Sequence, residues 1–309
     1  MPARDRTSAR IDDIVAKLNT LWESDRDAAF EFACQVVSRE RAHRALEPAL
    51  EILTHRPRFE ARPALRERFV DLTETGMRYD QDCALRVLIA GALRAIGATE
   101  DLDLAKIGLR TVQLQPPGRV DVAQGLRSAS LLWLSEIEPS RVDYYAVEML
   151  QDPHASTFSG EPALTAIRVL AARGQILPIW ALARRTALAP DCLAQAFASL
   201  RKIPADLQSE ALLEHLARAM DEGENGEGLA LVAAEAIVLN GLSPGYPTVL
   251  KLLRETTNPN LLLYLLTAIV RSGEVALRDE LARLQASEGD PSKRRVYDQM
   301  LGSTRTRRP

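Results

Sequence analysis

Four segments of this chain end in the same way, with an apolar residue followed four positions later by a glycine. They run from Leu93 to Gly97, Leu170 to Gly174, Ile237 to Gly241 and Ile269 to Gly273. Small or apolar residues also stand, almost without exception, one, four and eight places before that apolar residue, which is the spacing of one helical face. A glycine at this point is typical of a left-handed helix stop. The chain therefore repeats one helical unit, which predicts a stacked helical-repeat array.

Proline, glycine and acidic residues divide the chain into helix pairs about 30 to 40 residues apart, as in two-helix repeats. We expect the first helices to begin near Arg41, Gln81, Asp121, Glu161, Pro190, Gly228 and Pro259. We expect the second helices over residues 62–75, 101–112, 141–151, 176–187, 206–220, 245–256 and 275–286. Asp82 and Asp121 are expected to cap first helices, and Pro162, Pro190 and Pro259 suit first-turn positions.

The predicted fold class is all-α, a right-handed α-solenoid of about seven stacked helix pairs with capping helices at both ends. Residues 1–40 form the N-terminal cap (helices at 8–22 and 26–38), residues 41–287 the repeats, and 288–309 a C-terminal helix (291–301) with an arginine-rich tail. Caps are expected because the end of a solenoid would otherwise expose its core. Residues 303–309 are expected to be disordered. The connections 114–119, 152–160 and 221–228 are long, and no run is long enough to predict a strand.

One segment resembles a short bacterial HEAT repeat of the type found in bilin-lyase subunits. Its acidic start, apolar–arginine pair, alanine-rich middle and closing glycine match that pattern at Asp82, Leu85-Arg86, Ala90, Ala92-Leu93 and Ile96-Gly97. The segment from Asn258-Pro259 to Gly273 has the same length, with Leu262 in place of the arginine. The resemblance implies a HEAT-like or armadillo-like array over about residues 41–287. It implies no catalytic or chromophore-binding residue, because such motifs specify a fold and not a function.

Composition narrows the class of protein. With 46% apolar and 26% charged residues the chain can form a core, and 5% aromatic residues favour helices over sheets. The net charge of −3 disfavours a general polyanion binder. No apolar run is long enough to span a membrane, and the N-terminus lacks the apolar core of a secretory signal. Cys34, Cys83 and Cys192 are expected to be free thiols in a reducing cytoplasm.

No pattern of a metal, nucleotide or catalytic site is present in the sequence. The four histidines (His43, His55, His154 and His215) lack ligand spacing. The glycine-rich stretch Gly223–Gly228 lacks the lysine and the preceding strand of a phosphate loop. We therefore expect no metal, no cofactor and no catalytic residues, although a constellation assembled by folding stays open. Trp22, Trp133 and Trp180 are interpreted as structural, with a DNA-glycosylase-like site around Trp180 as the alternative.

The candidate binding surface is an arginine cluster at Arg58, Arg62, Arg66 and Arg68. Three of these side chains are spaced four apart and would lie along one helical face, which suits carboxylate or phosphate. The alternative is that nearby glutamates pair with them on the surface. If the cluster binds a ligand, charge reversal of Arg62 and Arg66 should weaken binding and shift the melting temperature by only a few degrees.

The sequence thus favours a non-catalytic, cytoplasmic scaffold or adaptor whose helical array binds a protein partner. One alternative is a nucleic-acid-binding repeat protein, such as a base-repair enzyme, that uses the row of arginines from Arg39 to Arg68 together with Arg184 and Arg185. Another is a regulatory subunit of an enzyme complex, as the resemblance to bilin-lyase subunits suggests. No interaction with a membrane is expected.

Overall fold

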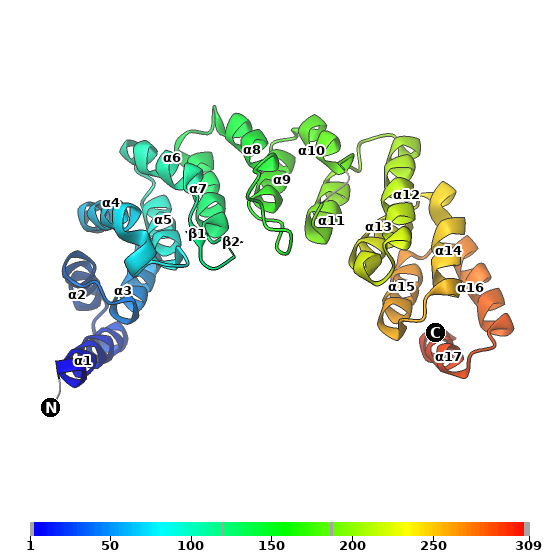
Figure 1. Cartoon of the computed structure of the whole chain (residues 1–309), viewed down its shortest axis with the longest axis horizontal. Coiled ribbons are helices and arrows are strands. Elements are labelled where there is room, and N and C mark those ends of the chain that lie inside the picture. The colour runs from blue at the N-terminus through cyan, green and yellow to red at the C-terminus, as the bar shows by residue number, and fades with distance from the viewer. Residues whose placement is uncertain (1–2, 119, 186–187, 306–309) are drawn as a thin grey trace. The chain divides into compact units, whose positions relative to one another are not determined.

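The computed structural model describes residues 3–118, 120–185 and 188–305, and within them the chain is all-α apart from one short two-stranded ribbon (Figure 1). The chain folds into two compact units. Unit 1 contains Met1–Ser156 and Glu161–Val169, and unit 2 contains Thr157–Gly160 and Leu170–Pro309. The boundary falls within one helix, α9 (Ala163–Ala172).

Unit 1 consists of helices joined by short turns. Its α-helices are α1 (Ala3–Ser24), α2 (Arg26–Arg39), α3 (His43–His55), α4 (Arg62–Tyr79), α5 (Ala84–Ile96), α6 (Leu102–Arg110), α7 (Gln124–Ile137) and α8 (Val142–Leu150). Two 3₁₀ turns, η1 (Phe59–Ala61) and η2 (Thr99–Asp101), precede α4 and α6. The ribbon pairs β1 (Leu114–Gln115) with β2 (Val120–Asp121) in antiparallel register.

The helices of unit 1 form two layers. Helices α1, α3, α5 and α7 pack on one another in that order, while α2, α4 and α6 form the second layer (Figure 1). Most of these helices also contact their neighbour in the chain, and every second helix from α1 to α7 lies in the same layer. Leu50, Ile89 and Leu93 are fully buried in this core. Small and unbranched side chains allow this close helix packing.

Unit 2 repeats the same alternation of helices. Its α-helices are α10 (Ile176–Ala183), α11 (Pro190–Ser199), α12 (Ala205–Asp221), α13 (Glu227–Leu239), α14 (Tyr246–Glu255), α15 (Pro259–Ser272), α16 (Val275–Ser287) and α17 (Pro291–Arg305). Two 3₁₀ turns are η3 (Gly223–Gly226) and η4 (Ser243–Gly245). Helices α11, α13, α15 and α17 pack in order, and α14 packs on α16 (Figure 1).

The structure confirms the helices that the sequence predicts. The expected helix starts, and the expected second helices, agree with the observed bounds to within about four residues, the usual uncertainty at helix ends. Of the expected 176–187 helix, residues 186–187 lie outside the described part of the chain. The proline at the start of α11 and of α15 stands at the first helical position, where a missing N–H is harmless.

The acidic connection 221–228 contains η3 and the first residues of α13. Two local expectations are wrong. The sequence predicts no strand in the connection 114–119, but Pro116, Pro117 and Gly118 turn the chain back and allow β1 and β2 to pair. It predicts a last helix that ends near residue 301 and disorder from 303, but α17 continues to Arg305; residues 306–309 are outside the described part.

The four repeat glycines end their helices, as predicted. Gly97, Gly174, Gly241 and Gly273 have φ angles of 74°, 74°, 66° and 76°. Among described residues other than glycine, only Cys83 has a positive φ, of 61°. This left-handed conformation is strained for a residue with a Cβ atom and unstrained for glycine. The helix ends predicted from these glycines are therefore the helix ends that the structure shows.

We expect Gly97→Ala to lower the free energy of unfolding by about 1–2 kcal/mol, because alanine in the left-handed region is strained. Gly91→Ala is the matched control, since Gly91 lies inside α5 and a Cβ atom there would meet nothing within 4 Å. The control should raise stability by up to about 1 kcal/mol, because alanine favours a helix interior. Urea unfolding followed by circular dichroism measures both. Equal effects of the two substitutions would contradict a left-handed stop at Gly97.

Candidate binding surface at the arginine cluster

The candidate arginines lie where α4 faces α2 and α6 in unit 1. Arg58 precedes η1, and its guanidinium forms an ion pair with Asp27 of α2. The same guanidinium lies 4.8 Å from the centre of the Phe30 ring, so a cation–π contact adds to the ion pair. Arg56 also reaches Asp27, at 3.0 Å. Arg58 therefore ties the segment before α4 to α2.

Arg62 and Arg66 converge on one carboxylate. Arg62 Nη2 lies 2.8 Å from Asp101 Oδ1, and Arg66 Nη1 contacts the same oxygen. Asp101 is fully buried at the end of η2, just before α6. Arg66 also reaches Asp103 Oδ2 at 3.1 Å. Folding thus brings two of the predicted surface cations onto a buried anion, where they connect α4 to α6.

Arg68 lies deeper than the other three arginines and holds the C-terminal end of α2. Its Nε and Nη2 donate to the Val37 carbonyl at 2.9 and 2.8 Å, and Nη2 also lies 3.3 Å from the Ser38 carbonyl. Its Nη1 pairs with Asp71 at 2.7 Å. The last carbonyl groups of a helix lack partners within the helix, and a cation near them is favoured by the helix dipole. Arg68 therefore caps α2.

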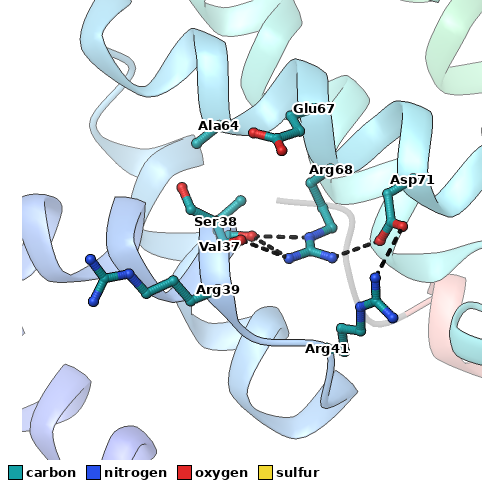
Figure 2. A pocket seen from close by; sticks show the side chains of 8 residues that line it. All are labelled: Val37, Ser38, Arg39, Arg41, Ala64, Glu67, Arg68 and Asp71. Carbon is teal, nitrogen blue, oxygen red and sulfur yellow. Dashed lines mark hydrogen bonds and ion pairs between the residues drawn. The ribbon is translucent and has the colours of Figure 1, made fainter.

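A pocket of about 240 Å³ opens beside Arg68, between the end of α2 and the middle of α4 (Figure 2). Its lining residues are Val37, Ser38, Arg39, Arg41, Ala64, Glu67, Arg68 and Asp71. In the view of Figure 2, Arg68 lies between Arg39 on one side and Arg41 with Asp71 on the other. Three arginines and two carboxylates therefore line a mostly polar pocket.

The exposed arginines of this pocket are less constrained than Arg68. Arg39 is exposed, and among the residues that the structure describes it has no hydrogen-bond or ion-pair partner. The Arg41 side chain is 61% exposed, and its Nη2 lies 3.7 Å from Asp71 Oδ1, which is too long for a hydrogen bond. The candidate surface predicted from the sequence did not include Arg39 and Arg41, which entered only the nucleic-acid alternative. Arg39 and Arg41 differ from Arg68 in that they are exposed, and exposure depends on how the chain folds.

Unit 1 also buries two charged clusters that sequence reasoning missed. Arg86 donates through Nε to Asp80 at 2.8 Å, and both side chains are almost fully buried. Arg127 pairs with Asp121 and Asp152, at 2.6 Å each. Asp121 and Arg127 lie 41 residues after Asp80 and Arg86.

The signal for the second cluster was present in the sequence. Leu126-Arg127 repeats the apolar–arginine pair Leu85-Arg86 at that distance. The search for a closing glycine missed the helix that contains Arg127, because Glu138 and not a glycine follows the end of α7. The cap at the start of α5 also differs from the expectation, which was Asp82. Asp80 accepts from the Leu85 and Arg86 N–H groups at 2.9 and 3.2 Å, while Asp82 accepts only from the Ala84 N–H, at 3.2 Å.

The described part of the chain contains no group of three or more histidine, cysteine or acidic side chains that could hold a metal ion. Burial raises the pKa of the Cys83 thiol to about 11, so it is protonated at neutral pH. Burial also lowers the pKa of His215, whose Nε2 lies 2.7 Å from the Ala183 carbonyl.

The three tryptophans differ in burial. Trp133 is fully buried, as expected for a core residue. Trp22 is half-buried, with the Arg26 guanidinium 4.0 Å from its ring centre. Trp180 is half-buried beneath Arg184, which lies 3.0 Å from Glu214.

Of the described helices, none is both long and apolar enough to cross a membrane.

Comparisons with known proteins identify no family. No protein-family model matches this chain, and no curated protein matches it either. The functional argument therefore rests on the residues and on their arrangement.

Proposed function

We propose that this protein is a non-catalytic interaction scaffold or adaptor that binds a protein partner. In this proposal the helix pairs of residues 41–287 form a right-handed HEAT-like solenoid, with residues 1–40 and 288–309 as caps. Packing within the units supports it, because α1, α3, α5 and α7 of unit 1 share one layer and α11, α13, α15 and α17 of unit 2 share another, as every second helix does in helical repeats. In the described part of the chain none of the three cysteines forms a disulfide, which is consistent with a cytoplasmic location that we include in the proposal.

The observation that carries the proposal is the pair of exposed arginines beside the α2–α4 pocket. Arg58, Arg62 and Arg66 are held by aspartates, so their role in this proposal is to fix α4 against α2 and α6. Arg68 forms the floor of the pocket, and Arg39 and Arg41 offer guanidinium groups to a ligand. Planar guanidinium groups bind carboxylates through paired hydrogen bonds. The partner that fits is an acidic protein segment.

We expect a fluorescently labelled decamer of glutamate to bind the protein, and a decamer of glutamine to bind at least tenfold more weakly. The double variant Arg39→Gln/Arg41→Gln should weaken glutamate binding by about tenfold, because two charge-assisted contacts are lost. Fluorescence anisotropy at low and physiological salt measures the dissociation constants. Binding should weaken as salt rises, since exposed charges are screened.

The control variant is Arg44→Gln/Arg94→Gln, which removes the same total charge from exposed arginines outside the pocket. These arginines pair with Asp12 and Glu136. The control should bind the glutamate decamer within about twofold of the wild type. An equal loss in both double variants would show that only net charge matters, and absence of binding by the wild type would contradict the pocket.

The same titration tests the nucleic-acid alternative. A duplex binder loses affinity with salt at a log–log slope of about −0.9 for each phosphate neutralised. This alternative has less support, because Arg62, Arg66 and Arg184 contact carboxylates. Duplex DNA that binds more tightly than the glutamate decamer would favour it over the scaffold. The enzyme-subunit alternative shares the scaffold's prediction of a protein partner.

A further inference from the structure

His215 is a buried titratable side chain that connects two helices of unit 2. It lies on α12 and is 2% exposed, and its Nε2 is 2.7 Å from the carbonyl oxygen of Ala183, the last residue of α10. On the other side of the ring, Nδ1 is 3.5 Å from Arg218 Nη2. The imidazole therefore lies between the C-terminal end of α10 and a cation of α12.

These two contacts fix the protonation state of the imidazole. A carbonyl oxygen only accepts hydrogen bonds, so Nε2 carries the proton and donates to Ala183. A guanidinium group only donates, so Nδ1 faces Arg218 with its lone pair. Neutral imidazole meets both requirements in one tautomer. Imidazolium does not, because its Nδ1–H would point at the N–H groups of Arg218.

The charges around His215 also oppose a second ring proton. Among the described residues, three charged groups act on it: Arg218 and Glu214 of α12 itself, and Arg184, which follows α10. Helix α13, which packs along α12, contributes none of these three groups. Glu214 is already 3.0 Å from Arg184, and no carboxylate of the described residues pairs with Arg218, whose Nη1 is buried without a hydrogen-bond partner. A charged imidazole would therefore meet a cation that nothing neutralises.

Helix α10 is the element of unit 2 that this contact can release. It has only eight residues, which is shorter than an isolated helix needs to be stable. No side chain caps its N-terminal end, and three of its side chains are buried: Ile179, Leu182 and Ala183. Short helices with few buried contacts open more readily than the rest of a fold. The bond from His215 to the last carbonyl group of α10 is thus one of few contacts that hold it.

We propose that the His215 contact between α10 and α12 is sensitive to pH: it holds α10 while the imidazole is neutral and opens when the imidazole is protonated. Protonation places a second cation beside Arg218 in a site without a free carboxylate, and an uncompensated buried charge is strongly unfavourable. Opening of the contact lets water reach the ring and so relieves this cost. The half-buried Trp180 of α10 then becomes accessible to solvent or to a partner.

The direction of the pH dependence follows from proton linkage. In the opened state His215 is in water and takes up a proton near pH 6.5, the ordinary value for histidine. In the closed state burial lowers the pKa of His215, and the cation Arg218 lowers it further. The opened state therefore binds more protons as the pH falls below about 6.5, and the contact weakens over that range.

Hydrogen exchange of the full chain at pH 7.5 and 5.5, followed by mass spectrometry and corrected for the intrinsic exchange rate, tests the proposal. One histidine can change the opening equilibrium by up to about tenfold between these pH values. We expect the protection of residues 176–183 to fall at least threefold at pH 5.5, while that of α13 changes less than twofold. If Arg218 moves away and the helices stay together, α10 keeps its protection, and the proposal is overturned.

Variants identify the group that takes up the proton. His215→Gln can still donate to Ala183 and accept from Arg218 but does not titrate, so it should keep the protection of α10 within twofold between the two pH values. Arg218→Gln should reduce the loss seen in the wild type, because the opposing cation is gone. The matched control is His43→Gln, which removes an exposed histidine of unit 1 and should lose protection as the wild type does.

The proposal is overturned if His215→Gln loses protection as the wild type does, or if Arg218→Gln leaves the loss unchanged. Circular dichroism melting at pH 7.5 checks that each variant is folded. An NMR titration of the imidazole signals of the wild type needs no variant. His215 should titrate below pH 6.5, and titration at or above that value would also overturn the proposal.

Discussion

Replacement of Arg86 by methionine is expected to lower the free energy of unfolding by about 3–5 kcal/mol, because it leaves the buried Asp80 carboxylate without its cation. Asp80 is fully buried and accepts from Arg86 Nε at 2.8 Å. Arg86 also contacts Gln113 Oε1, and Gln113 donates back to the Asp80 carbonyl at 2.9 Å. One substitution therefore disturbs a network that joins the start of α5 to the segment after α6. Urea unfolding followed by circular dichroism measures the loss.

Arg94→Met in the same helix is the matched control. Arg94 pairs with Glu136 at 2.6 Å, but both side chains are about 40% exposed, and such surface pairs contribute about 0–1 kcal/mol. Adding Asp80→Asn to Arg86→Met should restore part of the stability, because it removes the stranded charge. A loss no larger than that of Arg94→Met would show that the Asp80–Arg86 pair does not hold the helices together.

The double reversal Arg62→Glu/Arg66→Glu is expected to destabilise the protein by about 3–5 kcal/mol or to prevent folding. Both arginines face Asp101, whose side chain is fully buried, so the variant would place three carboxylates together. This differs from the sequence-based expectation of a shift of only a few degrees. The melting temperature measured by circular dichroism separates the two expectations, since about 1 kcal/mol corresponds to several degrees in a small domain.

A control with the same change in charge is Arg44→Glu/Arg283→Glu. These side chains are 68% and 74% exposed and pair with Asp12 and Glu280, which are 54% and 37% exposed. The control should melt within a few degrees of the wild type. If the melting temperature of the Arg62/Arg66 variant equals that of the control, the contacts to Asp101 contribute little to stability. The sequence-based interpretation of a free arginine surface would then regain support.

Local pattern was enough to predict the helices of this protein. A helix face recurs every three to four residues, and the left-handed stop has a strong preference for glycine, so Gly97 and Gly273 could be interpreted without a structure. The ribbon of β1 and β2 was missed because it depends on a turn and on only two residues in each strand. Periodicity cannot detect so short a pair.

The partners of the arginines could not be predicted in the same way. The sequence offered neighbouring glutamates, but Arg62 pairs with Asp101, 39 residues away, and Arg68 pairs with backbone carbonyls of α2. Such contacts form only when helices pack side by side, so spacing along one helix does not reveal them. Exposure of Arg39 is likewise a property of the packed chain.

The most direct test of the proposed scaffold function is an NMR titration of the ¹⁵N-labelled protein with the unlabelled glutamate decamer. We predict that amide shifts concentrate in the residues that line the α2–α4 pocket, from Val37 to Arg41 and from Ala64 to Asp71. The shifts should saturate and should disappear in Arg39→Gln/Arg41→Gln. Shifts spread evenly over exposed arginines, or no shifts at millimolar peptide, would contradict the account.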